Sequence, residues 1–190
     1  MIYKKSWKYI LIEGNYLYRI KSLKDFGDVP KGDLGGFVHS YHNLSQKGNC
    51  WIYNDAKVYD TAKVYGNAKI FENAQVYGDA KVFENAIICE KAKVSRHANI
   101  YGNAQISGKA VVSGHAKVFD NVQVTDNVNV FGQSLVFNNA KISGTSKVHG
   151  NAQVYDSAVV SGQSRICKNA IISGNARIEN QTLTKGIYRK

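Results

Sequence analysis

The chain has 190 residues, of which 44% are hydrophobic and 21% charged, a composition typical of one globular domain. The formal net charge of +11 favours an anionic partner, either a nucleic acid or an acidic protein; a coat of solvated lysines is the other explanation. No apolar run is long enough for a transmembrane helix and no signal peptide is evident, so we expect a cytoplasmic protein that does not engage a membrane.

Residues 1–50 precede a long repeat and are expected to form a β-rich cap. Apolar and polar residues alternate from Trp7 to Ile20, which predicts a hairpin that turns at Gly14–Asn15. A solenoid needs such a cap, because its first coil otherwise exposes both its core and an unpaired strand edge.

The repeat has a period of six residues. Every sixth residue from Ile52 to Ile178 is Val or Ile, over 22 consecutive positions, and a small residue stands two positions before most of them. A strict period of six is incompatible with a helix of 3.6 residues per turn. Residues two apart on a strand share a face, so this pattern predicts short strands with the small and aliphatic residues inward. Gly, Asp, Glu and Asn then form the corners.

This pattern resembles that of the hexapeptide-repeat proteins, in which a small residue follows an aliphatic one by four positions, as Ala62 follows Val58. The resemblance implies an all-β fold, a left-handed parallel β-helix of triangular section with three hexapeptides per coil. We expect about seven coils over residues 51–178 and a basic C-terminal tail over residues 179–190. Enzymes, antifreeze proteins and inert scaffolds share this fold, so it implies no function.

The segments Asp25–Val29, Gly35–Phe37 and Gly48–Tyr53 resemble the start of the YdcK-like β-helical proteins of bacteria and prophages. That resemblance implies a phage or prophage origin, and hence the host cytosol as the place of action. It supplies no site residue.

Residues eighteen apart should stack on successive coils, and one such column is entirely aromatic: Tyr65, Phe83, Tyr101, Phe119, Phe137 and Tyr155. Lys63, Lys81 and Lys117 fall in the column beside it. We interpret this aromatic strip as an interface for a protein partner or for a second copy of the chain. A ladder that only stabilises its own coils and a platform for nucleobases are the alternatives.

A column of asparagines is expected to hydrogen-bond from coil to coil with its backbones in the left-handed corner conformation: Asn67, Asn85, Asn103, Asn121, Asn139 and Asn175. The three cysteines are expected to be free thiols, because no two of them can approach closely enough for a disulfide.

An enzyme is the alternative function. His97 and His115 should stack at one corner, one coil after Asp79, and many proteins of this fold use a histidine for acyl transfer. A column of two imidazoles and a carboxylate is also a candidate metal site. The repeat contains no insertion that could wall a cleft, so we expect no catalysis, no cofactor and no metal.

The leading hypothesis is therefore a non-catalytic binding protein of phage origin that engages a nucleic acid or nucleoprotein, as in a counter-defence inhibitor. Its basic surface and aromatic strip would form the contact. An acyltransferase-like enzyme and a structural homo-oligomeric scaffold are the other two hypotheses.

Overall fold

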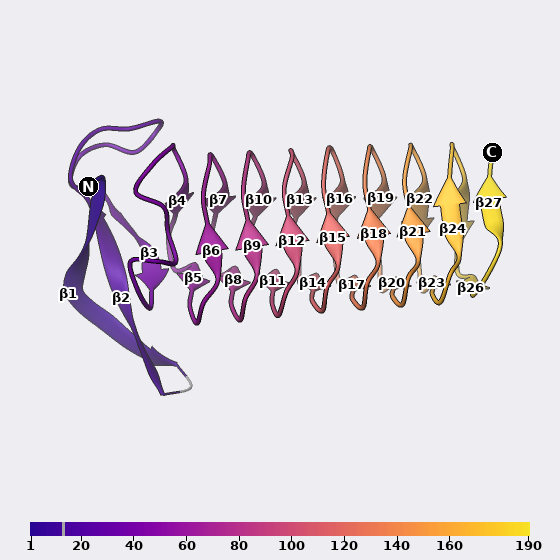
Figure 1. Ribbon diagram of the computed structural model, residues 1–190, viewed down its shortest axis with the longest axis horizontal. Coiled ribbons are helices and arrows are strands. Elements are labelled where there is room, and N and C mark those ends of the chain that lie inside the picture. The colour runs from indigo at the N-terminus through magenta and orange to yellow at the C-terminus, as the bar shows by residue number, and fades with distance from the viewer. Residues whose placement is uncertain (13) are drawn as a thin grey trace.

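The structure is a computed structural model in which residues 1–12 and 14–190 are described. It is a parallel β-solenoid of about eight turns with an antiparallel hairpin at its N-terminal end, and the two termini lie at opposite ends of the molecule (Figure 1). Three sheets run along the solenoid, so its section is triangular, as the hexapeptide pattern predicts. Among the described residues, no helix is long and apolar enough to cross a membrane.

The first sheet contains the N-terminal hairpin and one side of the solenoid. Its strands, in order across the sheet, are β1 (Tyr3–Ile12), β2 (Asn15–Ser22), β3 (Leu34–Val38), β5 (Lys57–Val58), β8 (Gln75–Val76), β11 (Lys93–Val94), β14 (Val111–Val112), β17 (Asn129–Val130), β20 (Lys147–Val148), β23 (Arg165–Ile166) and β26 (Thr182–Leu183).

The other two sheets each have eight strands. The second sheet consists of β4 (Trp51–Ile52), β7 (Lys69–Ile70), β10 (Ile87–Ile88), β13 (Gln105–Ile106), β16 (Gln123–Val124), β19 (Lys141–Ile142), β22 (Val159–Ser161) and β25 (Arg177–Glu179). The third sheet consists of β6 (Lys63–Val64), β9 (Lys81–Val82), β12 (Asn99–Ile100), β15 (Lys117–Val118), β18 (Leu135–Val136), β21 (Gln153–Val154), β24 (Ile171–Ser173) and β27 (Ile187–Arg189).

The register between coils is eighteen residues throughout the repeat, as the pairing of Asn99 with Lys117 and of Ile100 with Val118 illustrates. The Val or Ile of each repeat points inward, and none is more than 6% exposed. The small residues lie beside them in the core. Where serine replaces alanine in that position, its hydroxyl donates to the carbonyl three residues earlier, as Ser146 does to Ser143 over 2.8 Å. The core therefore contains no unsatisfied hydroxyl at these serines.

The corners depend on a residue with positive φ in every hexapeptide. Every sixth residue from Gly48 to Asn180 has φ between 52° and 79°, and about half of them are glycines. Glycine adopts this conformation without strain, and Asn and Asp tolerate it better than other residues.

The asparagine column hydrogen-bonds as predicted, with each Nδ2 donating to the Oδ1 of the next coil from Asn67 to Asn139 over 3.0–3.2 Å. The prediction of its backbone conformation is wrong. The left-handed residue is the one before each asparagine, such as Gly66 before Asn67. The backbone N–H of each asparagine donates to a backbone carbonyl of the next coil, as that of Asn67 does to the Glu84 carbonyl.

Both ends of the solenoid extend beyond the boundaries expected from the sequence. At the N-terminal end, β3 already pairs in parallel with β5, and Leu44 bridges Val64. At the C-terminal end, residues 179–190 complete a further coil, because β26 and β27 pair with β23 and β24. Tyr188 takes the position that Ile172 occupies one coil earlier and packs against the core.

Candidate binding surfaces

The aromatic strip forms one continuous stack along the third sheet. Neighbouring ring centroids lie 4.7–5.2 Å apart, and their planes deviate from parallel by only 1–10°. Each ring therefore covers the faces of its neighbours, and the rings present mainly their edges to the outside. No space remains between rings for an inserted base, so this geometry disfavours the nucleobase platform and fits either a stabilising ladder or a flat contact surface.

The hydroxyls of Tyr65 and Tyr101 in the strip are held in their neutral form. Burial raises the pKa of Tyr65, and the carboxylate of Glu84 raises it further. Burial likewise raises the pKa of Tyr101, with Asp120 and Glu84 adding to the effect. These tyrosines therefore act as apolar rings with neutral hydrogen-bonding groups at physiological pH.

The predicted basic residues lie beside the strip on the outward side of the third sheet. Lys63 pairs directly with Lys81 on the next coil, and Lys117 follows two coils later. All three side chains are exposed, and none of them forms an ion pair with any residue that the structure describes. Further along the sheet this column becomes apolar at Leu135 and Ile171.

Most corner carboxylates bind the backbone rather than lysines. Six of them accept a hydrogen bond from an amide one coil later, as Asp126 does from Gly144 over 2.9 Å; the others are Asp60, Glu84, Glu90, Asp120 and Asp156. These amides lie at the left-handed corner residues. Because these carboxylates accept hydrogen bonds from the backbone, few of them form ion pairs with the lysines on the flat faces of the solenoid.

The histidine column exists as predicted, but it is open to solvent. The rings of His97 and His115 stack 4.7 Å apart, and Nδ1 of His97 lies 3.4 Å from Asp79 Oδ2. Asp79 also accepts a hydrogen bond from Thr61, and both Asp79 and His97 are more than half exposed. No group of three or more potential ligands is positioned to hold a metal ion within the described part of the chain. The acyltransferase hypothesis stays a prediction.

All three cysteines are free thiols. Burial raises the pKa of Cys50 to about 11 and also raises the pKa of Cys89. Since the thiolate is the reactive form, these two side chains are mainly in the less reactive thiol form at neutral pH.

A second surface, on the N-terminal hairpin, was not singled out from the sequence. Tyr9 is 58% exposed and Tyr16 51%, and Leu11 lies with them on the outward side. Trp7, which is 83% exposed, lies on the other side and lines a depression with Arg19 and Phe37. On the inward side, Leu17 packs with Phe37 and Tyr59 of the solenoid. The available signal was that β1 is apolar on both faces, in the run Trp7–Ile12, whereas a capping strand needs only one apolar face.

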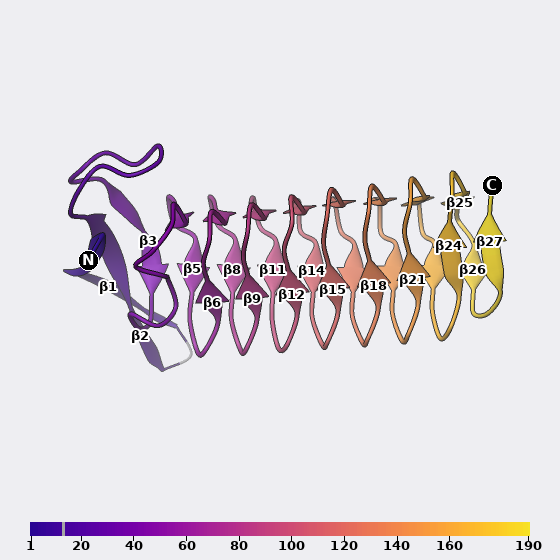
Figure 2. The same cartoon turned by 45° about the horizontal axis from the view of Figure 1, so that its top comes forward.

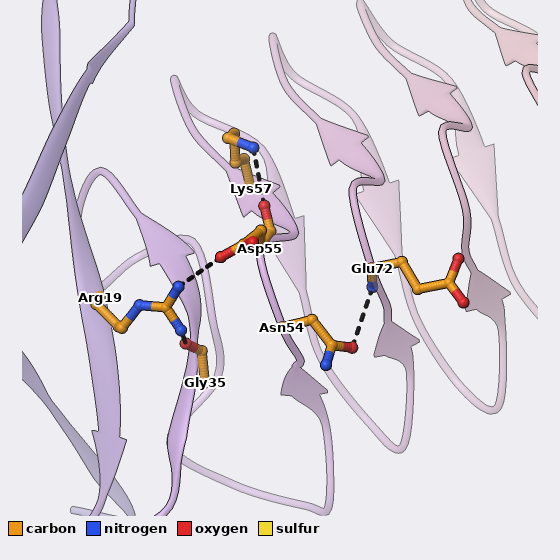
Figure 3. A network of polar contacts seen from close by, with 6 residues as sticks. All are labelled: Arg19, Gly35, Asn54, Asp55, Lys57 and Glu72. Atoms are coloured by element: carbon orange, nitrogen blue, oxygen red, sulfur yellow. Dashed lines mark hydrogen bonds and ion pairs between the residues drawn. The ribbon is translucent and has the colours of Figure 1, made fainter.

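Polar contacts fix the hairpin to the first coil (Figure 3). Arg19 on β2 places Nη2 2.5 Å from Asp55 Oδ1 and donates from Nη1 to the Gly35 carbonyl over 3.0 Å. The guanidinium also lies 4.4 Å from the ring centroid of Phe37. A guanidinium that contacts two separate acceptors and stacks on an aromatic ring is geometrically restricted, so the hairpin has a defined orientation.

No family model matches the chain, and no curated protein matches it either. The hexapeptide-type solenoid is supported by its three sheets and eighteen-residue register. The resemblance to the YdcK-like proteins, and the phage origin that it implies, receive no support from these comparisons.

Proposed function

We propose that this protein is a non-catalytic nucleic-acid-binding protein that presents the basic face of its third sheet to a phosphate backbone. The observation that carries this proposal is the exposed lysine column of Lys63, Lys81 and Lys117, which no neighbouring carboxylate neutralises among the described residues. When such lysines neutralise the phosphates of a nucleic acid, the cations condensed on the nucleic acid are released, which favours binding.

The stacked rings support this function indirectly. They form a rigid support beside the lysines. The Cα atoms of Lys63 and Lys81 lie one coil apart and those of Lys81 and Lys117 two coils apart, at about 4.8 Å per coil. Because this backbone is already ordered, binding of phosphates to the lysines does not have to order it. Contacts of this kind position a nucleic acid without reading its sequence.

The test is fluorescence anisotropy with labelled single-stranded DNA, duplex DNA and RNA at several salt concentrations. We expect affinity to fall steeply with salt and to fall further when Lys63, Lys81 and Lys117 are all changed to glutamate. The matched control changes Lys93, Lys141 and Lys147 to glutamate, which alters the net charge equally but on the other two sheets. Equal losses in both variants would contradict a specific role for the third sheet.

A structural homo-oligomer is the second candidate, favoured by the apolar end of the same face. Leu135 and Ile171 replace lysine there, beside the rings of Phe137 and Tyr155. Sedimentation velocity in high salt tests this function. Self-association that persists in high salt and is lost in Leu135→Ser with Phe137→Ser would support it, whereas a monomer at all concentrations would exclude it.

A further inference from the structure

The β1–β2 hairpin holds the most exposed aromatic side chain of the described chain, Trp7, which is 83% exposed. Tyr9 lies on the opposite face of the hairpin, where its ring contacts those of Tyr16 at 5.2 Å and Tyr18 at 6.1 Å. Trp7 contacts no other ring among the described residues, and the Lys8 ammonium lies 5.7 Å from its ring centroid. Trp7 therefore offers the exposed aromatic surface that the stacked rings of the third sheet lack.

Basic side chains surround Trp7. Residues 1–24 contain one acidic residue, Glu13, and six basic ones, which are Lys4, Lys5, Lys8, Arg19, Lys21 and Lys24. Two adjoining depressions share Trp7, Lys8 and Leu34 in their walls. Arg19 lines the first, and Lys4, Lys5 and Lys21 line the second. They enclose about 490 and 380 Å³, a size that accommodates a nucleotide.

The hairpin is oriented before any ligand binds. Ile10 and Leu17 face the solenoid, where Leu17 packs with Phe37 and Tyr59. Together with the Arg19–Asp55 ion pair, this packing directs Tyr9 and Tyr16 away from the solenoid. The hairpin projects from the end of the solenoid in both views of the molecule (Figure 1 and Figure 2). A fixed platform spends little binding energy on ordering itself.

We propose, on the basis of the function proposed above, that this hairpin is a site for single-stranded nucleic acid. An unpaired base stacks on Trp7, and Lys4, Lys8 and Lys21 contact the phosphates beside it. These three lysines line the same depression as Trp7, so cations and an aromatic ring lie together, as binding of an unpaired nucleotide requires. A duplex keeps its bases paired and stacked, so it cannot use the ring in this way.

Tryptophan fluorescence provides a direct test, because the chain has two tryptophans in opposite environments. Trp7 is 83% exposed and Trp51 only 1%. We expect titration with oligothymidine of about twenty nucleotides to quench the wild-type emission, because base stacking quenches an indole. The same titration of Trp7→Phe, in which Trp51 alone emits, should show no quenching, and a duplex of equal length should quench neither protein.

Affinity provides the second readout. Trp7→Ser should weaken binding of the oligothymidine by about fivefold or more, the loss expected for removing one stacked base. The matched control is Tyr9→Ser, which removes an exposed ring from the opposite face of the same hairpin. The control should bind as the wild type does. Circular dichroism of both variants establishes that each retains the solenoid.

The outcomes separate this site from the proposed function. Single-strand binding that is unchanged in Trp7→Ser, together with no quenching of Trp7 in the wild type, would overturn the hairpin site but not the role of the lysine column. Absence of binding to every nucleic acid tested would overturn both proposals and would make the hairpin a docking surface for a protein.

Discussion

The rings of Tyr101 and Phe119 stack with their centroids 4.8 Å apart and their planes 1° from parallel. Their separation equals the usual spacing of neighbouring strands, so the backbone register alone places the rings face to face. Each inner ring of the strip has two stacked neighbours, whereas Tyr65 at the end has one. The strip therefore links six coils into one side-chain stack.

The stability of the strip should depend on the number of stacked neighbours. Phe119→Ala removes two ring contacts and should lower the free energy of unfolding by about 2 kcal/mol, whereas Tyr65→Ala removes one and should cost about 1 kcal/mol. Urea unfolding followed by circular dichroism measures both values. Equal losses at the two positions would show that neighbouring rings do not stabilise one another.

The inward small position should accept serine but not a large side chain. Ala110→Ser should cost less than about 1 kcal/mol, because Ser134, Ser146 and Ser164 already occupy equivalent positions and donate to the carbonyl three residues earlier. Ala110→Leu should cost more than about 2 kcal/mol, since Ala110 has no exposed surface and the core has no room for three further carbons. Thermal unfolding of the pair checks this, and a stable Ala110→Leu protein would contradict tight packing of the coil.

The solenoid could be predicted in detail because its rules are local. A period of six and a corner residue in each repeat determine which side chains enter the core, and the eighteen-residue register then determines every column, including the ring stack and the asparagine hydrogen bonds. We predicted the left-handed corner residue one position too late, because glycine and asparagine occupy adjacent positions and both tolerate positive φ.

The hairpin surface could not be predicted in the same way. Its strands have apolar residues on both faces, so the sequence does not distinguish Tyr9, which is exposed, from Leu17, which is buried. That distinction depends on the docking of Leu17 against Phe37 and Tyr59, a contact between distant parts of the chain. The ion pair between Arg19 and Asp55 is another contact between distant parts of the chain.

The junction between cap and solenoid should be sensitive at Gly36. A Cβ at this position would lie 2.4 Å from the Ala56 carbonyl oxygen and 2.5 Å from a side-chain carbon of Ile52, so Gly36→Ala forces β3 away from the first coil. The control is Gly32→Ala, where a Cβ meets nothing within 4 Å and only the positive φ opposes the change. Limited proteolysis should cleave the N-terminal region faster in Gly36→Ala than in Gly32→Ala; equal rates would argue against close packing of β3.

Asp28, in the loop before β3, should stabilise the folded protein less in acid, when its carboxylate becomes protonated. Lys69 Nζ lies 2.7 Å from Asp28 Oδ2, and the Tyr53 hydroxyl donates to Oδ1 over 2.8 Å. The hydrogen bond from Lys69 is the largest cause that holds the pKa of Asp28 below its usual 3.8, with the Tyr53 hydroxyl adding to it. The unfolded chain therefore binds more protons than the folded one just below pH 3.8, and stability falls as the pH falls through this range.

We expect the difference in unfolding free energy between wild type and Asp28→Asn to be constant above about pH 5 and to vanish in stronger acid. The control is Asp33→Asn at an exposed carboxylate that forms no ion pair within the described chain, and its difference from wild type should not follow that course. A difference between wild type and Asp28→Asn that is independent of pH would mean that Lys69 does not stabilise the ionised form of Asp28.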